Sequence, residues 1–204
     1  MSRPRRPDRN KLYELASQQA GYFSARQARE SGFSGQLVSW HVHAGNFLRV
    51  RRGLYRLQRY PVSPQDHIIE AWLAAGPLAV VSHESALNLH GLSDVVPSAV
   101  HLVVPRSHRW VAGRVPSGVA LHTTVRPLPT NAVATVGAVR VTTPARSIVD
   151  AADAGTAPDQ ILVAIREALN QGLTTPRELR TASGNRSARV RELVDRGIRE
   201  AKAA

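Results

Sequence analysis

The chain has 204 residues, of which 43% are hydrophobic and none is a cysteine. This is enough for one large or two small folded domains, and the lack of thiols excludes disulfide frameworks, thiolate zinc sites, iron–sulfur centres and cysteine nucleophiles. The formal net charge is +12, and residues 1–60 hold 12 basic against 3 acidic residues. We therefore expect the N-terminal part to bind a polyanion, the alternative being charge that only keeps the protein soluble.

Residues 1–10 are predicted to form a flexible basic arm, because they combine two prolines with several arginines and almost no large apolar side chain. Arg3, Arg5 and Arg6 of this arm are candidate DNA contacts, since basic arms often lie in a groove or along phosphates. An unstructured tail that binds nothing in particular is the alternative. No apolar segment follows the arm, as a secretory signal would require.

Three short helices are predicted next, over residues 12–19, 25–30 and 35–44, with a hydrophobic link at 22–23. Each apolar stripe has helical spacing and ends at a glycine, a residue typical of helix C-termini. The expected N-cap residues are Ser24 and Ser34. The side-chain period then changes to two, which predicts strands 47–50 and 54–57 joined by a tight glycine turn.

Three helices followed by a hairpin predict a winged helix-turn-helix domain over residues 11–60. Its third helix is expected to enter the major groove of DNA, with Leu37 and either His41 or Ala44 facing the core. The candidate DNA contacts of this helix are Ser34, Gln36, Ser39, Trp40 and His43. A core or hairpin contact is the alternative for Trp40, and a solvated surface position is the alternative for His43.

Four arginines surround the predicted hairpin turn and are expected to contact the DNA backbone or to reach a minor groove: Arg49, Arg51, Arg52 and Arg56. Such contacts contribute salt-dependent affinity that does not depend on base sequence. A three-helix unit with a hairpin can also be purely structural, but that role does not require a charged tip.

Residues 61–204 are predicted to form a second, α+β domain with a mixed sheet and a helical C-terminus. Ser63 followed by Pro64 predicts a helix start, and residues 106–116 are expected to form a loop. In the last helix, apolar residues recur with the spacing i, i+3, i+4, i+7 from Val190 onwards. That stripe is expected to pack on the domain, the alternative being a surface for a partner or a dimer.

The sequence carries no pattern that predicts catalysis or a metal site. His41 and His43 are two residues apart and cannot face one ion from a helix, whereas His83 and His90 could share a helical face, but no third ligand is visible. The one Glu-x-Lys sequence lies at residues 200–202 in a predicted helix, where a restriction-type nuclease does not place it. We therefore expect no enzymatic activity, no metal site and no cofactor.

The sequence resembles the AbiEi-type antitoxins. The match is carried by residues 12–16 and 21–28 and by the wing sequence G-N-F-L-R-V-R-R-G-L-Y at residues 45–55. It continues more loosely through V-S-H-E-S-A-L at 81–87, L-H-G-L at 89–92 and T-T-P-A-R-S-I-V-D at 142–150. The resemblance covers most of the chain, and it implies an N-terminal winged helix followed by an antitoxin domain.

The resemblance implies an antitoxin that binds operator DNA, represses its own operon and counteracts a nucleotidyltransferase-like toxin. A cytoplasmic location is expected because the sequence shows neither a secretory signal nor an apolar run that could span a bilayer. It does not decide whether the toxin is contacted directly, and a monomer that binds DNA repeats cooperatively is compatible with it. Two other functions stay open: a nucleic-acid-processing enzyme targeted by the winged helix, and a transcription factor that senses a ligand through its second domain. No membrane partner is expected, because no apolar run is long enough to span a bilayer.

Overall fold

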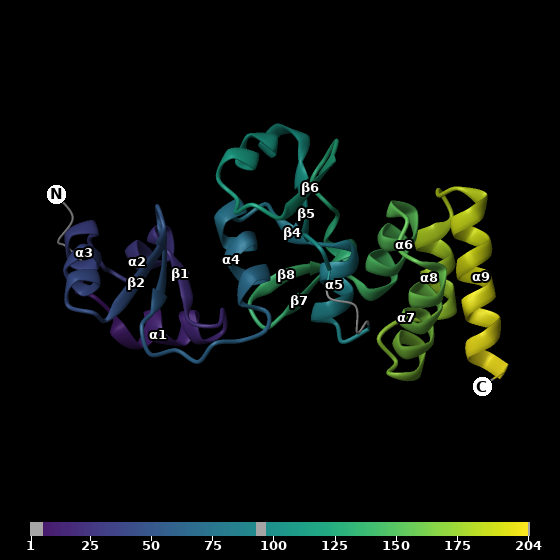
Figure 1. Cartoon of the computed structure of the whole chain (residues 1–204), viewed down its shortest axis with the longest axis horizontal. Helices are drawn as coiled ribbons and strands as arrows, with labels where there is room; N and C mark the ends of the chain where they lie inside the picture. The colour runs from purple at the N-terminus through teal and green to yellow at the C-terminus, as the bar shows by residue number, and fades with distance from the viewer. Residues whose placement is uncertain (1–5, 93–96, 204) are drawn as a thin grey trace. The chain divides into compact units, whose positions relative to one another are not determined.

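The computed structural model describes residues 6–92 and 97–203. The chain folds into two compact units, which Figure 1 shows with their elements labelled. The first comprises Met1–Pro77 with Gly137–Val139, and the second comprises Leu78–Val136 with Arg140–Ala204. Each unit combines helices with a sheet, which confirms the predicted α+β class.

The first unit begins as a winged helix-turn-helix. Its elements are α1 (Arg9–Ser17), β1 (Tyr22–Ser24), α2 (Ala25–Glu30), α3 (Gly35–His43), β2 (Phe47–Arg51), β3 (Leu54–Leu57) and α4 (Asp66–Ala75). Ser24 and Ser34 are N-caps, as predicted, and their hydroxyls accept from the backbone N–H groups of Gln27 and Leu37. Gln27 also accepts from the Ser24 N–H, which completes a capping box.

The strands of the first unit form a three-stranded sheet in the order β1-β3-β2. The hairpin of β2 and β3 is confirmed, and its turn uses Gly53 at φ +77°, a conformation that few residues other than glycine adopt. The prediction of a mere link at residues 22–23 was wrong, because β1 pairs with β3 from Tyr22 to Ser24. A strand of three residues is too short to show a period of two in the sequence.

An aromatic cluster forms the core of this unit. Phe23, Phe33 and Phe47 are buried together with Leu12 and other apolar residues of the three helices. The ring centroids of Phe23 and Phe47 lie 4.9 Å apart in an edge-to-face arrangement, which is favourable for aromatic rings. The ring of His41 in α3 stacks on Phe47 with 4.7 Å between centroids, which holds α3 against the hairpin.

The first unit extends beyond residue 60, where we expected it to end. It includes α4, whose buried face contains Ile68, Ile69 and Trp72. The helix begins at Asp66 and not at the predicted Ser63–Pro64 start. The Ser63 hydroxyl accepts from the Gln65 N–H and forms a turn before the helix.

The second unit carries a five-stranded mixed sheet in the order β6-β5-β4-β8-β7. Strands β5 and β6 run parallel, β4 and β5 run antiparallel, and β4 and β8 run parallel. Its elements are β4 (Val80–Val81), α5 (His83–Leu89), β5 (Val100–Pro105), η1 (Arg106–Gly113), β6 (Val119–Thr124), η2 (Thr130–Ala132), β7 (Val133–Val136), β8 (Val139–Thr142), α6 (Pro144–Ala154), α7 (Pro158–Asn170), α8 (Pro176–Ser183) and α9 (Ala188–Ala203). The loop predicted over residues 106–116 is wrong, since most of it forms the 3₁₀ helix η1.

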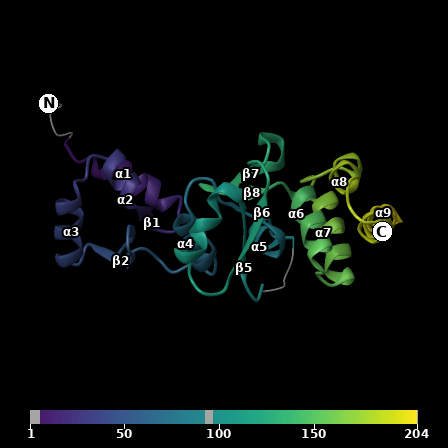
Figure 2. The ribbon, with the colours of Figure 1, turned by 90° about the horizontal axis from the view of Figure 1, so that it is seen from above.

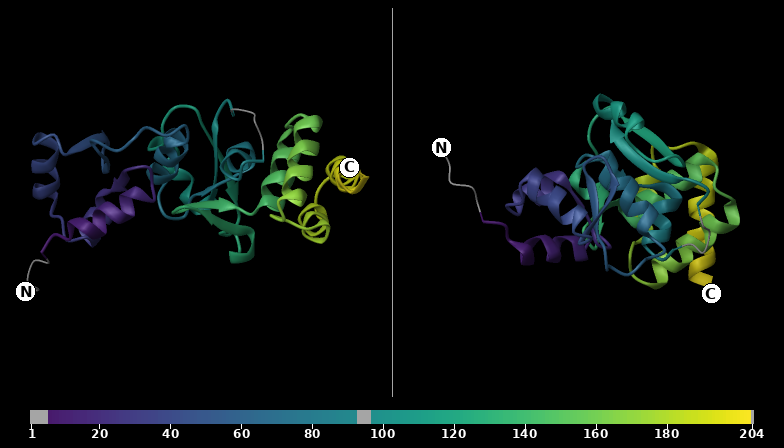
Figure 3. Two further views of the ribbon diagram at one scale, coloured as in Figure 1. Left: turned by 90° about the horizontal axis from the view of Figure 1, so that it is seen from below. Right: turned by 60° about the vertical axis from the view of Figure 1, so that its left-hand side comes forward.

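Helices α6 to α9 pack together at one end of the second unit (Figures 2 and 3). Val190, Val194 and Ile198 of α9 are fully buried in their common core, so the apolar stripe packs within the unit as predicted. Gly197 permits close approach to α7, because a Cβ atom there would lie 2.6 Å from Ile165 Cδ1. None of the helices in residues 6–92 and 97–203 combines the length and apolar character needed to cross a bilayer.

Candidate nucleic-acid interface

Helix α3 exposes the polar face that the sequence predicts for a recognition helix. Gln36, Ser39 and His43 are exposed, whereas Val38 and His41 are buried against the core. Leu37 is half-buried and packs on the aromatic cluster. Ala44 is exposed, so of the two residues considered for the inner face the structure selects His41.

Trp40 lies on the outside of α3. Its side chain is 58% exposed and meets the ring of His41 edge-on, at 4.9 Å between centroids. The alternative of a core or hairpin contact is therefore wrong for Trp40. An indole in this position can stack on a sugar or a base, or pack against the methyl group of thymine.

Hydrogen bonds within α3 restrict what two other candidates can do. The Nδ1 atom of His43 lies 2.8 Å from the Ser39 carbonyl oxygen. Since a carbonyl only accepts, Nδ1 carries the proton, and a neutral His43 offers Nε2 as an acceptor for a base edge. The Ser34 hydroxyl accepts the capping bond from Leu37 and still has its own proton to donate.

The wing carries two arginines free of acidic partners. Arg49 and Arg52 are exposed, and no carboxylate of the described residues lies within ion-pair distance of either. Arg51 differs, because its Nε donates to Oε1 of Glu70 in α4 at 2.6 Å. Its charge is compensated within the unit, so we expect Arg51 to fix the wing to α4 more than to contact DNA.

The prediction that Arg56 contacts DNA is wrong, because this residue is buried inside the first unit. Its side chain is 9% exposed, and its Nη2 donates to Oδ2 of Asp66 at 3.2 Å and to the Pro61 carbonyl at 2.8 Å. Its Nε donates to the Ala20 carbonyl, and the guanidinium lies over the ring of Tyr22. A guanidinium enclosed in this way cannot reach a phosphate, so Arg56 has a structural role.

The predicted N-terminal arm is shorter than ten residues. Asp8 caps α1, which starts at Arg9, and the Asp8 N–H donates to the Ser31 carbonyl at 2.8 Å. The chain also passes close to Gly32, where a Cβ atom would lie 2.6 Å from the Arg6 carbonyl oxygen. Arg6 is therefore near the turn before α3, while the predicted contacts Arg3 and Arg5 lie outside the described residues.

The charges of α3 and the wing are of one sign. Residues 31–65 contain no aspartate or glutamate, while the wing and the segment after it contain five arginines. Two of these arginines are compensated by the carboxylates of α4. The positive charge that remains is therefore presented by the wing tip and by Arg59, which suits a phosphate backbone.

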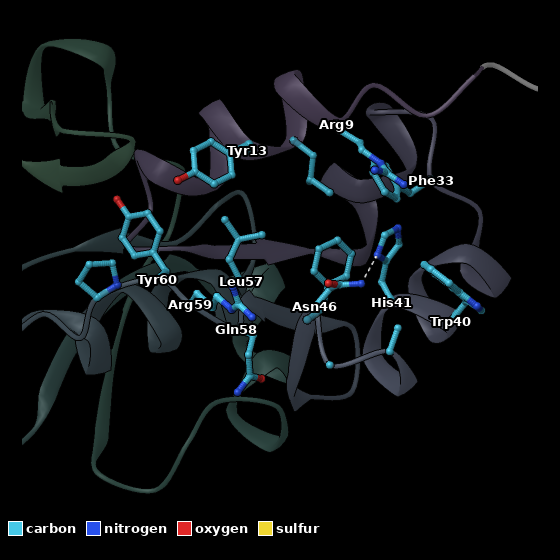
Figure 4. Close-up of a pocket in the computed structure, with 15 residues that line it drawn as sticks. Arg9, Tyr13, Phe33, Trp40, His41, Asn46, Leu57, Gln58, Arg59 and Tyr60 are labelled. Carbon is cyan, nitrogen blue, oxygen red and sulfur yellow. Dashed lines mark hydrogen bonds between the residues drawn. The ribbon is translucent and has the colours of Figure 1, made fainter.

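A pocket of about 620 Å³ lies beside helix α3 (Figure 4). Aromatic and basic side chains line it, among them Arg9, Tyr13, Trp40 and Tyr60. His41 also lines it, with Nδ1 bonded to the Asn46 amide and Nε2 buried without a partner among the described residues. Burial, and then the charge of Arg9, lower the pKa of His41, so the ring is neutral at pH 7.

The structure does not bring together the histidine pair considered for a metal. The Nε2 of His90 donates to the Thr142 carbonyl at 2.8 Å, so this ring nitrogen has a structural hydrogen bond and is not available to bind a metal. His83 lies instead beside His101 and His122 on neighbouring strands. No motif in the sequence links these three residues, because they come together only through the pairing of β5 with both β4 and β6.

A helix-turn-helix with a basic wing and an exposed polar recognition helix defines a class of DNA-binding transcriptional regulators. Family models agree with that class. Residues 10–58 match the model described as transcriptional regulator, AbiEi antitoxin, and residues 75–196 match the AbiEi antitoxin C-terminal domain. The chain belongs to the AbiEi antitoxin family.

Among solved structures, the chain is similar to the RV2827C protein from Mycobacterium tuberculosis. The TM-score is 0.58 at 14% sequence identity, over 94% of this chain and 78% of that one. At this identity the similarity concerns the fold alone. A comparison with curated proteins finds no match.

Replacing Arg56 with methionine should lower the free energy of unfolding by about 1–3 kcal/mol, because the half-buried Asp66 carboxylate and the Ala20 and Pro61 carbonyls would lose their donor. Urea denaturation followed by circular dichroism measures this. Arg59→Met is the matched control, since Arg59 is exposed, and it should change stability by less than about 0.5 kcal/mol. Equal stability of the two variants would contradict the structural role of Arg56.

Proposed function

We propose that this protein binds operator DNA in the promoter of its own toxin–antitoxin operon and represses that operon. The observation that carries the proposal is the surface made by α3 and the wing. It presents the polar side chains of α3 and the uncompensated Arg49 and Arg52, in a segment without a single acidic residue.

Helix α3 would supply the base contacts in the major groove. Gln36 lies in its first turn, and a glutamine amide matches the donor and acceptor of an adenine edge. Ser39 is one turn further on and can bond to a base or a phosphate. His43 offers an acceptor and Trp40 an apolar face, so one helix face combines four different kinds of contact.

The wing would supply most of the affinity that does not depend on sequence. The guanidinium groups of Arg49 and Arg52 can each replace a counterion on the DNA backbone, which makes the affinity salt-dependent. Ser34 and Arg6, at the approach to α3, would contact phosphates of the same strand. Phosphate contacts of this kind position the helix, and base contacts then select the operator.

The second unit would counteract a nucleotidyltransferase-like toxin encoded beside this gene. The support is the family to which residues 75–196 belong, whose description is that of an antitoxin domain. We propose that this action needs no catalysis by the chain and takes place in the cytoplasm.

Removing the two uncompensated wing arginines together, Arg49→Ala with Arg52→Ala, should weaken binding to any duplex. The slope of log Kd against log salt concentration should fall by about 0.9 for each lost phosphate contact, or about 1.8 in all. Fluorescence anisotropy at several salt concentrations measures this slope. Arg106→Ala with Arg109→Ala removes the same charge from exposed positions in the second unit and should leave the slope unchanged. If both pairs change it equally, the wing has no specific part in binding.

Gln36→Ala should affect sequence preference instead of overall affinity. If Gln36 contacts a base, the preference for the operator over a scrambled duplex falls by about 1–3 kcal/mol, with an unchanged salt slope. Competition binding between the two duplexes tests this, with the exposed Gln171→Ala as control. An intact preference would remove Gln36 from the proposed base contacts.

The two proposed activities should separate in cells. With the toxin expressed from an independent promoter, the Arg49→Ala, Arg52→Ala variant should still restore growth, because the second unit is unchanged. The same variant should release a reporter driven by the operon promoter to its unrepressed level. Loss of growth rescue at equal protein abundance would contradict the assignment of toxin counteraction to the second unit.

A further inference from the structure

Three histidines converge in the second unit, which carries none of the residues of the proposed DNA interface. They are His83, which follows β4 at the start of α5, His101 on β5 and His122 on β6. Each offers one ring nitrogen, and these three nitrogens all lie within 4.8 Å of one another. His83 is buried, and the other two are half-buried.

The sheet register brings two of these rings together. In the parallel pair β5–β6, His101 is opposite Ala120 and His122 is opposite Val103. Side chains two residues apart on a strand share a face, so both histidines lie on the same face of the sheet. His83, the third histidine, lies next to them because β4 pairs with β5. At the end of β4 the Ser82 N–H donates to the His101 carbonyl at 3.0 Å.

The distances match those required by a metal with imidazole ligands. Nδ1 of His101 lies 3.0 Å from Nε2 of His122. Two imidazole nitrogens that bind one tetrahedral Zn²⁺ at about 2.0–2.1 Å are about 3.3–3.4 Å apart. The third nitrogen, within 4.8 Å of the others, needs to move about 1.5 Å closer at most to reach the same spacing.

Neighbouring side chains orient the rings as metal sites require. The Ser82 hydroxyl lies 2.8 Å from Nδ1 of His83, which leaves Nε2 of that ring for a ligand bond. A partner on the other ring nitrogen is the usual support of a metal-bound histidine. The Ser85 hydroxyl accepts from the His101 N–H at 2.9 Å and fixes the strand beneath its ring.

The backbone at His83 is held in an unusual conformation. Its φ is +53°, in the left-handed region, which residues with a side chain seldom adopt and which recurs at ligand sites. The adjacent Ser82 and His101 hold this turn through the bonds described above. The surrounding contacts thus hold the His83 ring in the cluster, although its backbone conformation is locally unfavourable.

The rings are in the protonation state that a metal needs. Burial, followed by the charges of the other two histidines, lowers the pKa of His83 to about 3. Burial also lowers the pKa of His101 and of His122. All three imidazoles are therefore neutral near pH 7, as metal ligands must be.

Two carboxylates act on the cluster electrostatically, Glu84 on His101 and Asp150 on His122. Both are already engaged by other side chains. Glu84 accepts from the Thr156 hydroxyl at 2.8 Å, and Asp150 is ion-paired with Arg146 and Arg186. Neither is free to serve as a fourth ligand without losing these bonds.

We propose that His83, His101 and His122 bind one Zn²⁺ ion and leave its fourth position to water. Nitrogen ligands without thiolates or carboxylates favour zinc and similar transition metals over magnesium or calcium. In the metal-free protein, one proton lies in the hydrogen bond between His101 Nδ1 and His122 Nε2. Both nitrogens must be unprotonated to bind zinc, so the ring that donates this proton has to change its tautomer. Each of the two rings then carries its single proton on its other nitrogen, so no net proton is released.

Titration of the metal-free, full-length protein with Zn²⁺ tests the proposal. The protein is prepared without a histidine tag and stripped with a chelator, and a chromophoric chelator competes for the ion. We expect one equivalent of zinc to bind with a Kd below about 1 μM at pH 7.5. Less than 0.2 equivalents bound at about 10 μM free zinc would overturn the proposal whatever the variants do.

Variants locate the site. His101→Ala and His122→Ala should each raise the Kd at least 100-fold, whereas His67→Ala, which removes an exposed histidine of α4, should leave it unchanged. Circular dichroism checks that each variant is folded, and His122→Gln replaces His122→Ala if it is not. Unchanged zinc affinity in a folded His101 or His122 variant would overturn the proposal.

Cobalt gives an independent readout that a surface ion does not produce. Co²⁺ in place of Zn²⁺ should give the intense visible absorption of a tetrahedral site. This absorption should reach its full strength at one equivalent of cobalt, in both the wild type and the His67→Ala variant. The weak spectrum of octahedral, water-rich cobalt in the wild type would contradict a three-histidine site.

Discussion

The ion pair between the buried Arg56 and the half-buried Asp66 is the interaction on which the first unit depends. One guanidinium binds the carbonyls of Ala20 and Pro61 as well as the carboxylate. It therefore ties together the turn before β1, the segment after β3 and the start of α4. Without it, a half-buried carboxylate and two carbonyls would lose their donor, and the Arg51–Glu70 pair would remain as the ion pair between the wing and α4.

This pair and the Arg51–Glu70 pair together determine which positive charges of the wing are compensated by acidic residues. Of the arginines in and around the wing, Arg56 and Arg51 are compensated by carboxylates of α4, and Arg49 and Arg52 are not. Helix α4 thus has two effects. Its carboxylates stabilise the hairpin by pairing with Arg51 and Arg56, and they leave the charges of Arg49 and Arg52 available to bind DNA. The proposed DNA interface follows from this division of charges and from the exposed face of α3.

The second unit is stabilised by interactions of its own. Its helical core is apolar and is built from α6 to α9, whereas the mixed sheet carries the histidine cluster on two neighbouring strands. A zinc ion there would connect β5, β6 and the start of α5, and it would make the stability of this unit depend on metal concentration. The proposal is independent of the DNA-binding role, because every ligand belongs to the second unit.

The sequence by itself determined the elements whose signals are local. Ser34 and Gly45 delimit α3, Gly53 sets the hairpin, and the apolar stripe beginning at Val190 marks α9 as a packed helix. Only the tertiary structure decided that Arg52 is exposed and Arg56 buried, because two arginines four residues apart look alike until α4 packs against one of them. The same holds for His83, His101 and His122, since residues far apart in the chain become neighbours only when strand register is fixed, and register depends on long-range pairing that no local pattern encodes.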